Sequence, residues 1–176
     1  MNKINIDGVL IVEGKEDVSY LSSFLNALFF TTNGYDVNKE KIEFLKLAST
    51  TNKLIIFSDS DDAGESIRNK LKSEINGVFE AKCQQNYRKN YKKKGIAEST
   101  KESIVDALKE FVSDTPIELY NYDLSTLVSL STDPEKSKRL IINKYRLIEG
   151  NLKSIQNQLN ILRVKPHEIR EFLNGN

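Results

Sequence analysis

The chain has 176 residues, among them 26 Lys and Arg, 25 Asp and Glu, one His and one Cys. That length suits one domain, or one domain with a small appendage, and the composition is typical of a soluble folded protein. The single Cys excludes an intrachain disulfide and a zinc site built from several cysteines. No apolar run can span a bilayer, and the first residues lack the core of a signal peptide. We therefore expect a cytosolic protein without membrane attachment.

The net charge of +1 hides a strong segregation of charge along the chain. Residues 82–94 contain six basic and no acidic residues, and residues 95–135 contain two basic and nine acidic ones. Residues 136–170 contain nine basic and two acidic ones. Because two basic blocks flank an acidic one, the nearly neutral total does not argue against an anionic partner.

The first half of the chain alternates between buried strands and amphipathic helices. The apolar run Gly8–Val12 predicts a strand that is buried on both faces. Apolar residues at helical spacing follow over 17–30, and a short strand is expected at 29–32. The next elements are a helix over 38–48 capped by Asn38, a strand over 54–57, a helix over 63–75 and a strand over 77–81. This order predicts an α/β fold with a parallel four-stranded sheet flanked by helices.

The second half is expected to be largely helical. After a stretch without apolar periodicity at 83–94, Thr100 is placed to cap a helix over 101–112. The last part, 133–173, predicts three helices, with a break at Gly150-Asn151 and a new start at Pro166. We therefore expect an α/β domain over 1–115 and a small C-terminal helical domain over 116–176.

Three carboxylates are predicted at one edge of the sheet. Glu13 directly follows the first strand, and Asp59 and Asp61 follow the strand at 54–57. Because parallel strands end at the same edge, these side chains are expected to lie near one another. Asp59 and Asp61 are two residues apart, so in an extended segment they share a face.

Carboxylate oxygens in this arrangement suit Mg²⁺, which takes few protein ligands and keeps water for a phosphate substrate. We expect Glu13, Asp59 and Asp61 to be metal ligands and catalytic residues, with Glu13 as a third ligand or a general base. Lys15 would offset phosphate charge, and Gly64 opens a helix whose N-terminus carries partial positive charge.

A structural interpretation of these acids stays open. Acidic residues are common at the starts of helices, where they accept hydrogen bonds from backbone N–H groups. Asp61 or Asp62 would therefore serve equally well as a cap for the helix at 63–75.

The placement of the acids resembles the Toprim domain, which is shared by topoisomerases, bacterial primases, RecR-type repair proteins and several nucleases. The signature of that family is an acid after the first strand and Asp-x-Asp after the third. Glu13 and Asp59-Ser60-Asp61 match it here. The resemblance covers about residues 7–82 and implies a Toprim-like fold for the first domain.

A second resemblance, to the ribonuclease M5 family, covers nearly the whole chain. Its motifs stand here at Val12–Asp17, Thr32–Gly34, Phe57–Asp61, Gly64–Arg68, Lys94–Glu98 and, in the tail, Arg139–Leu162. The resemblance implies a cytoplasmic endonuclease that uses Mg²⁺ to process precursor 5S ribosomal RNA, helped by the large-subunit ribosomal protein that binds 5S rRNA. We expect a monomer in which residues 1–115 are catalytic and residues 116–176 bind RNA or a partner.

The chain departs from the ribonuclease M5 pattern at a few positions. Ser60 stands where the family usually has Pro, Lys15 stands where Arg is frequent, and the segment after Glu98 is one residue shorter. None of these differences removes a carboxylate, but they leave the cleavage pattern open.

The residues predicted to contact RNA lie mainly in one basic segment, where Tyr can stack on unpaired bases and Lys and Arg neutralise phosphates. This segment contains Tyr87, Arg88, Lys89, Tyr91, Lys92, Lys93 and Lys94. Further expected contacts are Lys15, Asn33 and Arg68. The alternatives are a solvated charged surface for the segment and an ion pair with Glu65 for Arg68. The tail offers a second, less specific surface with Lys136, Lys138, Arg139, Lys144 and Arg146.

Two other functions are compatible with strand-end acids. One is a Toprim-type module that binds or processes DNA without ribonuclease activity, as in recombination mediators or primases. The other is a receiver domain, which accepts a phosphoryl group on a strand-end Asp. The basic segment and the helical tail argue against the receiver domain.

Overall fold

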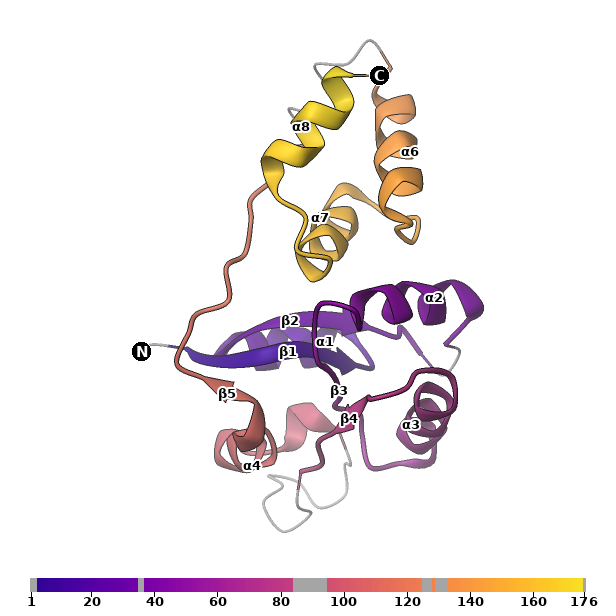
Figure 1. Cartoon of the computed structure of the whole chain (residues 1–176). Coiled ribbons are helices and arrows are strands. Elements are labelled where there is room, and N and C mark those ends of the chain that lie inside the picture. The colour runs from indigo at the N-terminus through magenta and orange to yellow at the C-terminus, as the bar shows by residue number, and fades with distance from the viewer. Residues whose placement is uncertain (1–2, 35–36, 84–94, 125–127, 129–132, 176) are drawn as a thin grey trace. The chain divides into compact units, whose positions relative to one another are not determined.

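The computed structural model describes residues 3–34, 37–83, 95–124, 128 and 133–175 (Figure 1). The chain divides into two compact units, Met1–Ile117 and Glu118–Asn176. Each unit has buried apolar residues of its own. Within the described ranges, no helix combines the length and the apolar character that a membrane-spanning segment needs.

The first unit is built on a sheet whose four main strands are parallel. Its elements up to the fourth strand are β1 (Ile4–Val12), α1 (Lys15–Ser22), β2 (Leu25–Thr31), α2 (Lys39–Ala48), β3 (Leu54–Ile56), α3 (Asp62–Glu74) and β4 (Phe79–Glu80). The strand order is β2-β1-β3-β4 (Figure 1). The predicted α/β fold is confirmed, and β1 and β3 are neighbours at the centre of the sheet.

Four short elements complete the first unit. They are the 3₁₀ turn η2 (Ile96–Glu98), α4 (Lys101–Ala107), the 3₁₀ turn η3 (Lys109–Phe111) and β5 (Val112–Ser113). β5 pairs antiparallel with the start of β1, where Val112 lies opposite Ile6. The expected helix over 101–112 is therefore wrong beyond Ala107. The chain continues as the turn η3 and then pairs with β1, a long-range contact that apolar spacing does not reveal.

The predicted helix over 17–30 is also wrong in its second half. α1 ends at Ser22 and β2 begins at Leu25, four residues before the expected strand. Leu25 and Leu28 fit helical spacing, but they also fit a strand that is buried on both faces and therefore needs no strict alternation. Pairing with β1 decides between the two, because Leu28 lies opposite Val9 in the parallel ladder.

Helices cover both faces of the sheet. On one face, Leu10 of β1 belongs to a buried cluster with Leu21 of α1 and Ile104 of α4. Successive strand residues point to opposite faces. The next position, Ile11, pairs with Phe30 of β2, whose ring stacks on Phe44 of α2 at a centroid distance of 5.6 Å. A sheet buried on both sides explains why β1 reads as a continuous apolar run.

The second unit is helical, as predicted. In its described part it contains α6 (Pro134–Tyr145), α7 (Leu152–Ile161) and α8 (Pro166–Asn174). The side chains of Asp133 and Asn151 cap α6 and α7 by accepting hydrogen bonds from backbone N–H groups. The fully buried Tyr122 donates its hydroxyl to the Val164 carbonyl at 2.6 Å, which ties the segment that enters the unit to the turn before α8.

We expect the Tyr122→Phe substitution to lower the free energy of unfolding by about 1–3 kcal/mol, because it leaves the buried Val164 carbonyl without its donor. The matched control is Tyr120→Phe, whose hydroxyl binds Glu118 at the surface. The control should change stability by less than about 0.5 kcal/mol. Urea unfolding of the whole chain measures both. Equal effects of the two substitutions would contradict the assignment of this bond.

Candidate active site

Glu13 and Asp59 meet at the carboxyl edge of the sheet. Glu13 directly follows β1, and Asp59 follows β3, the neighbouring strand. The backbone N–H of Asp59 donates to Glu13 Oε1 at 2.8 Å. In sheets with this strand order, the switch point between the first and third strands is where ligands bind. The expected meeting of acids from two separate strands is therefore present in the structure.

Asp59 is held in a partly buried position among other acids. Its Oδ1 accepts a hydrogen bond from the backbone N–H of Ile96 at 2.7 Å. The pKa of Asp59 is raised to about 7, mainly by burial. The charges of Glu13, Asp17 and Asp61 also raise this pKa, whereas the hydrogen bond from Ile96 lowers it. Burial likewise raises the pKa of Glu13. The structure thus gathers several acids in a partly buried place, and the positive charge of Arg68 offsets the rise in the pKa of Glu13 only in part.

Asp61 begins α3, the helix that follows the acids. Its Oδ1 accepts a hydrogen bond from the backbone N–H of Gly64 at 2.9 Å, which makes it the N-cap of the helix. The structural interpretation of Asp61 is therefore confirmed. A cap uses one carboxylate oxygen for this bond, and a metal-binding role of Asp61 stays a prediction.

Gly64 allows the start of α3 to approach the acids closely. A Cβ atom at this position would overlap the carbonyl oxygen of Asp59 and would lie 2.9 Å from Glu13 Oε1. Any larger residue would therefore push the loop after β3 away from Glu13. The absence of a side chain here lets the loop, the helix and the β1 end pack together.

Arg68 does not point outward from α3. It is 8% exposed, and its Nη1 donates to Ser58 Oγ at 2.8 Å and to the Asp59 carbonyl at 2.7 Å. Its ion-pair partner is Glu80 of β4 at 3.3 Å, not Glu65 as the helical spacing suggested. The structure shows Arg68 bonded inside the protein, and a direct contact with RNA stays a prediction.

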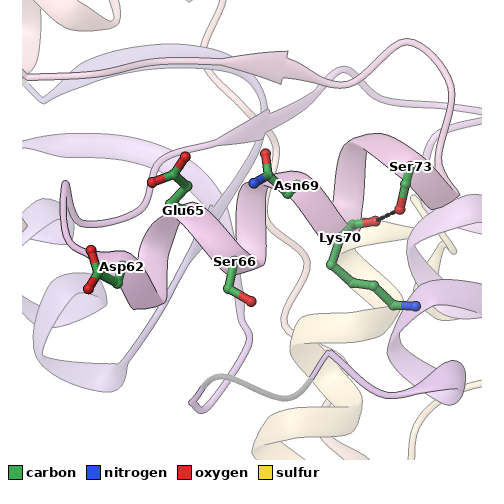
Figure 2. Close-up of a pocket in the computed structure, with 6 residues that line it drawn as sticks. All are labelled: Asp62, Glu65, Ser66, Asn69, Lys70 and Ser73. Atoms are coloured by element: carbon green, nitrogen blue, oxygen red, sulfur yellow. Dashed lines mark hydrogen bonds between the residues drawn. The ribbon is translucent and has the colours of Figure 1, made fainter.

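The outward face of α3 is a separate feature. Figure 2 shows a pocket there, lined by Asp62, Glu65, Ser66, Asn69, Lys70 and Ser73. None of the three predicted catalytic acids lines it. The inward face carries Gly64, Ile67, Arg68 and Leu71 instead. The helix thus has a solvent face and a face that organises the acids.

Asp17 also belongs to the acidic group, although the sequence pattern predicts no role for it. It is 8% exposed, and its Oδ2 accepts a hydrogen bond from the Gly14 backbone N–H at 2.9 Å. Burial raises its pKa, and the charges of Glu16 and Glu98 add to the rise. An acid in the first turn of a helix, three residues after a Gly that starts it, was the signal that could have identified this cap.

The remaining predicted RNA contacts are only partly described by the structure. Lys15 and Asn33 are exposed near the same edge, and the backbone N–H of Asn33 donates to the Glu13 carbonyl at 3.0 Å. Asn33 has a φ of 53°, a left-handed conformation that Asn tolerates. The basic segment that contains Tyr87, Arg88, Lys89, Tyr91, Lys92, Lys93 and Lys94 lies outside the described residues.

The donor types at this edge fit Mg²⁺. Within the described residues, no three His, Cys, Asp or Glu side chains stand close enough together to hold one metal ion. The predicted ligand set of Glu13, Asp59 and Asp61 on one ion therefore stays a prediction. Mg²⁺ is usually held by one or two carboxylates, with water and phosphate oxygens completing its shell. Glu13 and Asp59 could supply those carboxylates, because they lie at the same edge and nearby acids raise the pKa of each.

Comparison with known proteins identifies the family. Residues 8–98 match the Toprim domain. The chain is 31% identical over 172 residues to the ribonuclease M5 of Mycoplasma genitalium, with 97% of each chain covered. It is 33% identical over 178 residues to that of Mesoplasma florum, with 94% of this chain and 97% of the relative covered. The chain belongs to the ribonuclease M5 family. The resemblance predicted from the sequence motifs is thereby confirmed over almost the full length.

A solved structure supports the Toprim fold of this ribonuclease M5 family member. The small TOPRIM domain protein from Bacillus stearothermophilus superposes with a TM-score of 0.51 at 19% identity. The match covers 61% of this chain and 93% of that protein. At this identity the likeness concerns the fold, not the reaction.

We expect Asp59→Asn to raise the melting temperature of the metal-free protein by about 2–4 °C, the shift that about 1 kcal/mol produces in a chain of this size. The substitution removes a half-buried charge but keeps an oxygen that accepts the Ile96 bond.

The pKa of Asp59 also predicts how the stability of the wild type depends on pH. The folded-state pKa of about 7 lies above the ordinary value of 3.8, so the wild type should lose stability as the pH rises from about 4 to 7. Thermal melts in EDTA between pH 4 and 8 measure both effects.

The control for this prediction is Asp62→Asn, which removes an exposed acid at the start of the same helix. It should lower stability slightly, because Asp62 interacts favourably with the helix N-terminus. If the wild type instead gains stability relative to Asp59→Asn as the pH rises from 4 to 7, the pKa of Asp59 is not raised in the folded protein, and the prediction is wrong.

We expect Gly64→Ala to lower the free energy of unfolding by about 1–3 kcal/mol, because the new methyl group overlaps the Asp59 carbonyl. Where space allows, the same change in a helix stabilises a protein by about 0.4–1 kcal/mol. The sign of the effect therefore tests the close approach. Ser66→Ala, on the outward face of α3, is the control and should change stability little (Figure 2). Stabilisation by Gly64→Ala in urea unfolding would refute the geometry.

Proposed function

We propose that this protein is a Mg²⁺-dependent endoribonuclease that cleaves precursor 5S ribosomal RNA to its mature form. The observation that carries the proposal is the bond between Glu13 and Asp59 at the ends of the two central strands. Family membership over nearly the full length supports the same conclusion, because the relatives are named as ribonucleases.

The strand-end acids have the properties that phosphodiester hydrolysis needs. Mg²⁺ held at this edge would act as a Lewis acid on the phosphate and would lower the pKa of a coordinated water. Glu13 acts as a ligand or as the base that takes the proton of the attacking water, and its raised pKa suits the second role. Asp59 and Asp61 would act as ligands of Mg²⁺, and the hydrogen bond from the Ile96 N–H orients the Asp59 side chain.

RNA contacts are proposed around this edge. Lys15, at the start of α1, is exposed and would neutralise a phosphate next to Glu13. Exposed Asn33 lies at the end of the neighbouring strand, β2. The basic segment 87–94 would add base stacking and further phosphate contacts.

The C-terminal unit is proposed to bind RNA or the partner protein. Helix α6 and its C-cap expose Lys136, Arg139, Lys144 and Arg146. Exposed cations on one short helix attract a phosphate backbone without reading its sequence. The partner would be the large-subunit ribosomal protein that binds 5S rRNA, which presents the precursor in its folded form.

We expect Glu13→Gln and Asp59→Asn to reduce cleavage of precursor 5S rRNA at least about 100-fold, the contribution typical of a positioned acid or base. Binding of the precursor should survive, because both substitutions keep the shape of the side chain. Gel assays of cleavage and filter binding with the same RNA measure the two properties. Asp62→Asn, with its exposed carboxylate on the outward face of α3, serves as the active control.

Equal cleavage by wild type and both variants would refute the role of the acids. Tight binding of RNA or duplex DNA by the wild type, without metal-dependent cleavage of any RNA, would instead indicate a Toprim-type binding module.

A further inference from the structure

Arg68 is a charged residue on the buried face of α3. It lies one turn after Gly64, with Ile67 and Leu71 on the same inward face. The opposite face carries the pocket of Figure 2, which includes Lys70. A cation in such a place loses much of its hydration, so its contacts have to replace the bonds to water.

The guanidinium of Arg68 holds the loop that carries Asp59. Its Nη1 donates to Ser58 Oγ at 2.8 Å and to the carbonyl of Asp59 at 2.7 Å. The Ser58 hydroxyl in turn donates to the Gly64 carbonyl at 3.2 Å, which links the loop to α3. One planar group thus bridges the loop and the helix that follows it.

Asp59 is thereby fixed through three separate groups. Its backbone N–H donates to Glu13 Oε1, its carbonyl accepts from Arg68, and its side-chain Oδ1 accepts from the Ile96 N–H. Of these three contacts, only the one with Arg68 comes from a cationic side chain. Removing it would free the carbonyl and let the backbone of Asp59 rotate.

Glu80 balances the charge of Arg68 and has other cations available. Arg68 Nε lies 3.3 Å from Glu80 Oε1, and Lys82 Nζ lies 2.7 Å from the same oxygen. Lys72 pairs with the second oxygen of Glu80. Burial opposes the ionisation of Glu80, but the bonds from Lys72 and Lys82 hold its pKa below the ordinary value. Glu80 would therefore keep two partners if Arg68 were replaced.

We propose that Arg68 is a positioning residue, which fixes the backbone of Asp59 so that its carboxylate stands beside Glu13 in the geometry that cleavage needs. This inference rests on the proposed function for its catalytic consequence. It assigns Arg68 to the ordering of the acids, in place of the contact with RNA that the sequence suggested.

Arg68→Met tests the proposal, because Met fills similar space and donates no hydrogen bonds. In the metal-free protein, the amide protons of Asp59 and Ile96 should exchange with solvent about ten-fold faster or more, the effect of losing one buried hydrogen bond. At saturating Mg²⁺, kcat for precursor 5S rRNA should fall about ten-fold or more, with KM within about two-fold of wild type. Hydrogen exchange by NMR and steady-state kinetics give the two readouts.

Lys70→Met is the matched control. It removes a cation from the outward face of the same helix, where Lys70 pairs with Glu74. Exchange at Asp59 and Ile96, and kcat, should stay at their wild-type values. If Arg68→Met does not fold, Arg68→Lys carries the same test, because it keeps a charge opposite Glu80 but lacks the forked donors. It should speed exchange at the same two amides.

Unchanged exchange at Asp59 and Ile96 in a folded Arg68 variant would overturn the proposal. A rise in KM with kcat preserved would also overturn it, and would indicate that Arg68 contacts the RNA. If the wild type cleaves no RNA, the proposed function fails, whereas the exchange measurement still decides whether Arg68 orders the acids.

Discussion

A hydrogen bond from the backbone of Asp59 to the carboxylate of Glu13 joins the ends of the two central strands. The other features of the candidate site are arranged around this contact. The cap that Asp61 provides, the close approach at Gly64 and the inward direction of Arg68 all fix the loop that carries Asp59. The sheet makes the contact possible, because parallel neighbouring strands deliver their following residues to one edge.

This arrangement costs stability in the absence of a cation. Burial raises the pKa values of Glu13, Asp17 and Asp59, and repulsion from neighbouring acids adds to the rise of each. Functional sites commonly keep such unfavourable groups in place because the surrounding structure holds them. Here the apolar residues of β1, packed on both faces of the sheet, provide that support. A divalent ion bound at this edge would relieve the repulsion and would therefore raise the free energy of unfolding.

The sequence was sufficient to bring Glu13 and Asp59 to one edge of the sheet, because the position of both follows from the alternation of strands and helices. It was insufficient where two patterns fit the same residues, as at Leu25, where pairing with β1 produces a strand. The sequence also suggested the wrong partner for Arg68, because helical spacing favours an ion pair with Glu65, whereas the structure pairs Arg68 with Glu80. Arg68 lies between Ile67 and Leu71 on the apolar face of α3, and this position could have indicated that its side chain is buried. The burial of Asp17 depends on how α1 packs, which no local pattern encodes.

The central claim is that carboxylates from separate strands form a divalent-metal site that cuts RNA. The most direct measurement is incubation of precursor 5S rRNA with the wild-type protein in Mg²⁺ and in EDTA, each with and without the 5S-binding ribosomal protein. The account predicts discrete cleavage to the mature length in Mg²⁺ and none in EDTA. Cleavage that proceeds equally in EDTA, or its absence under all four conditions, would contradict it.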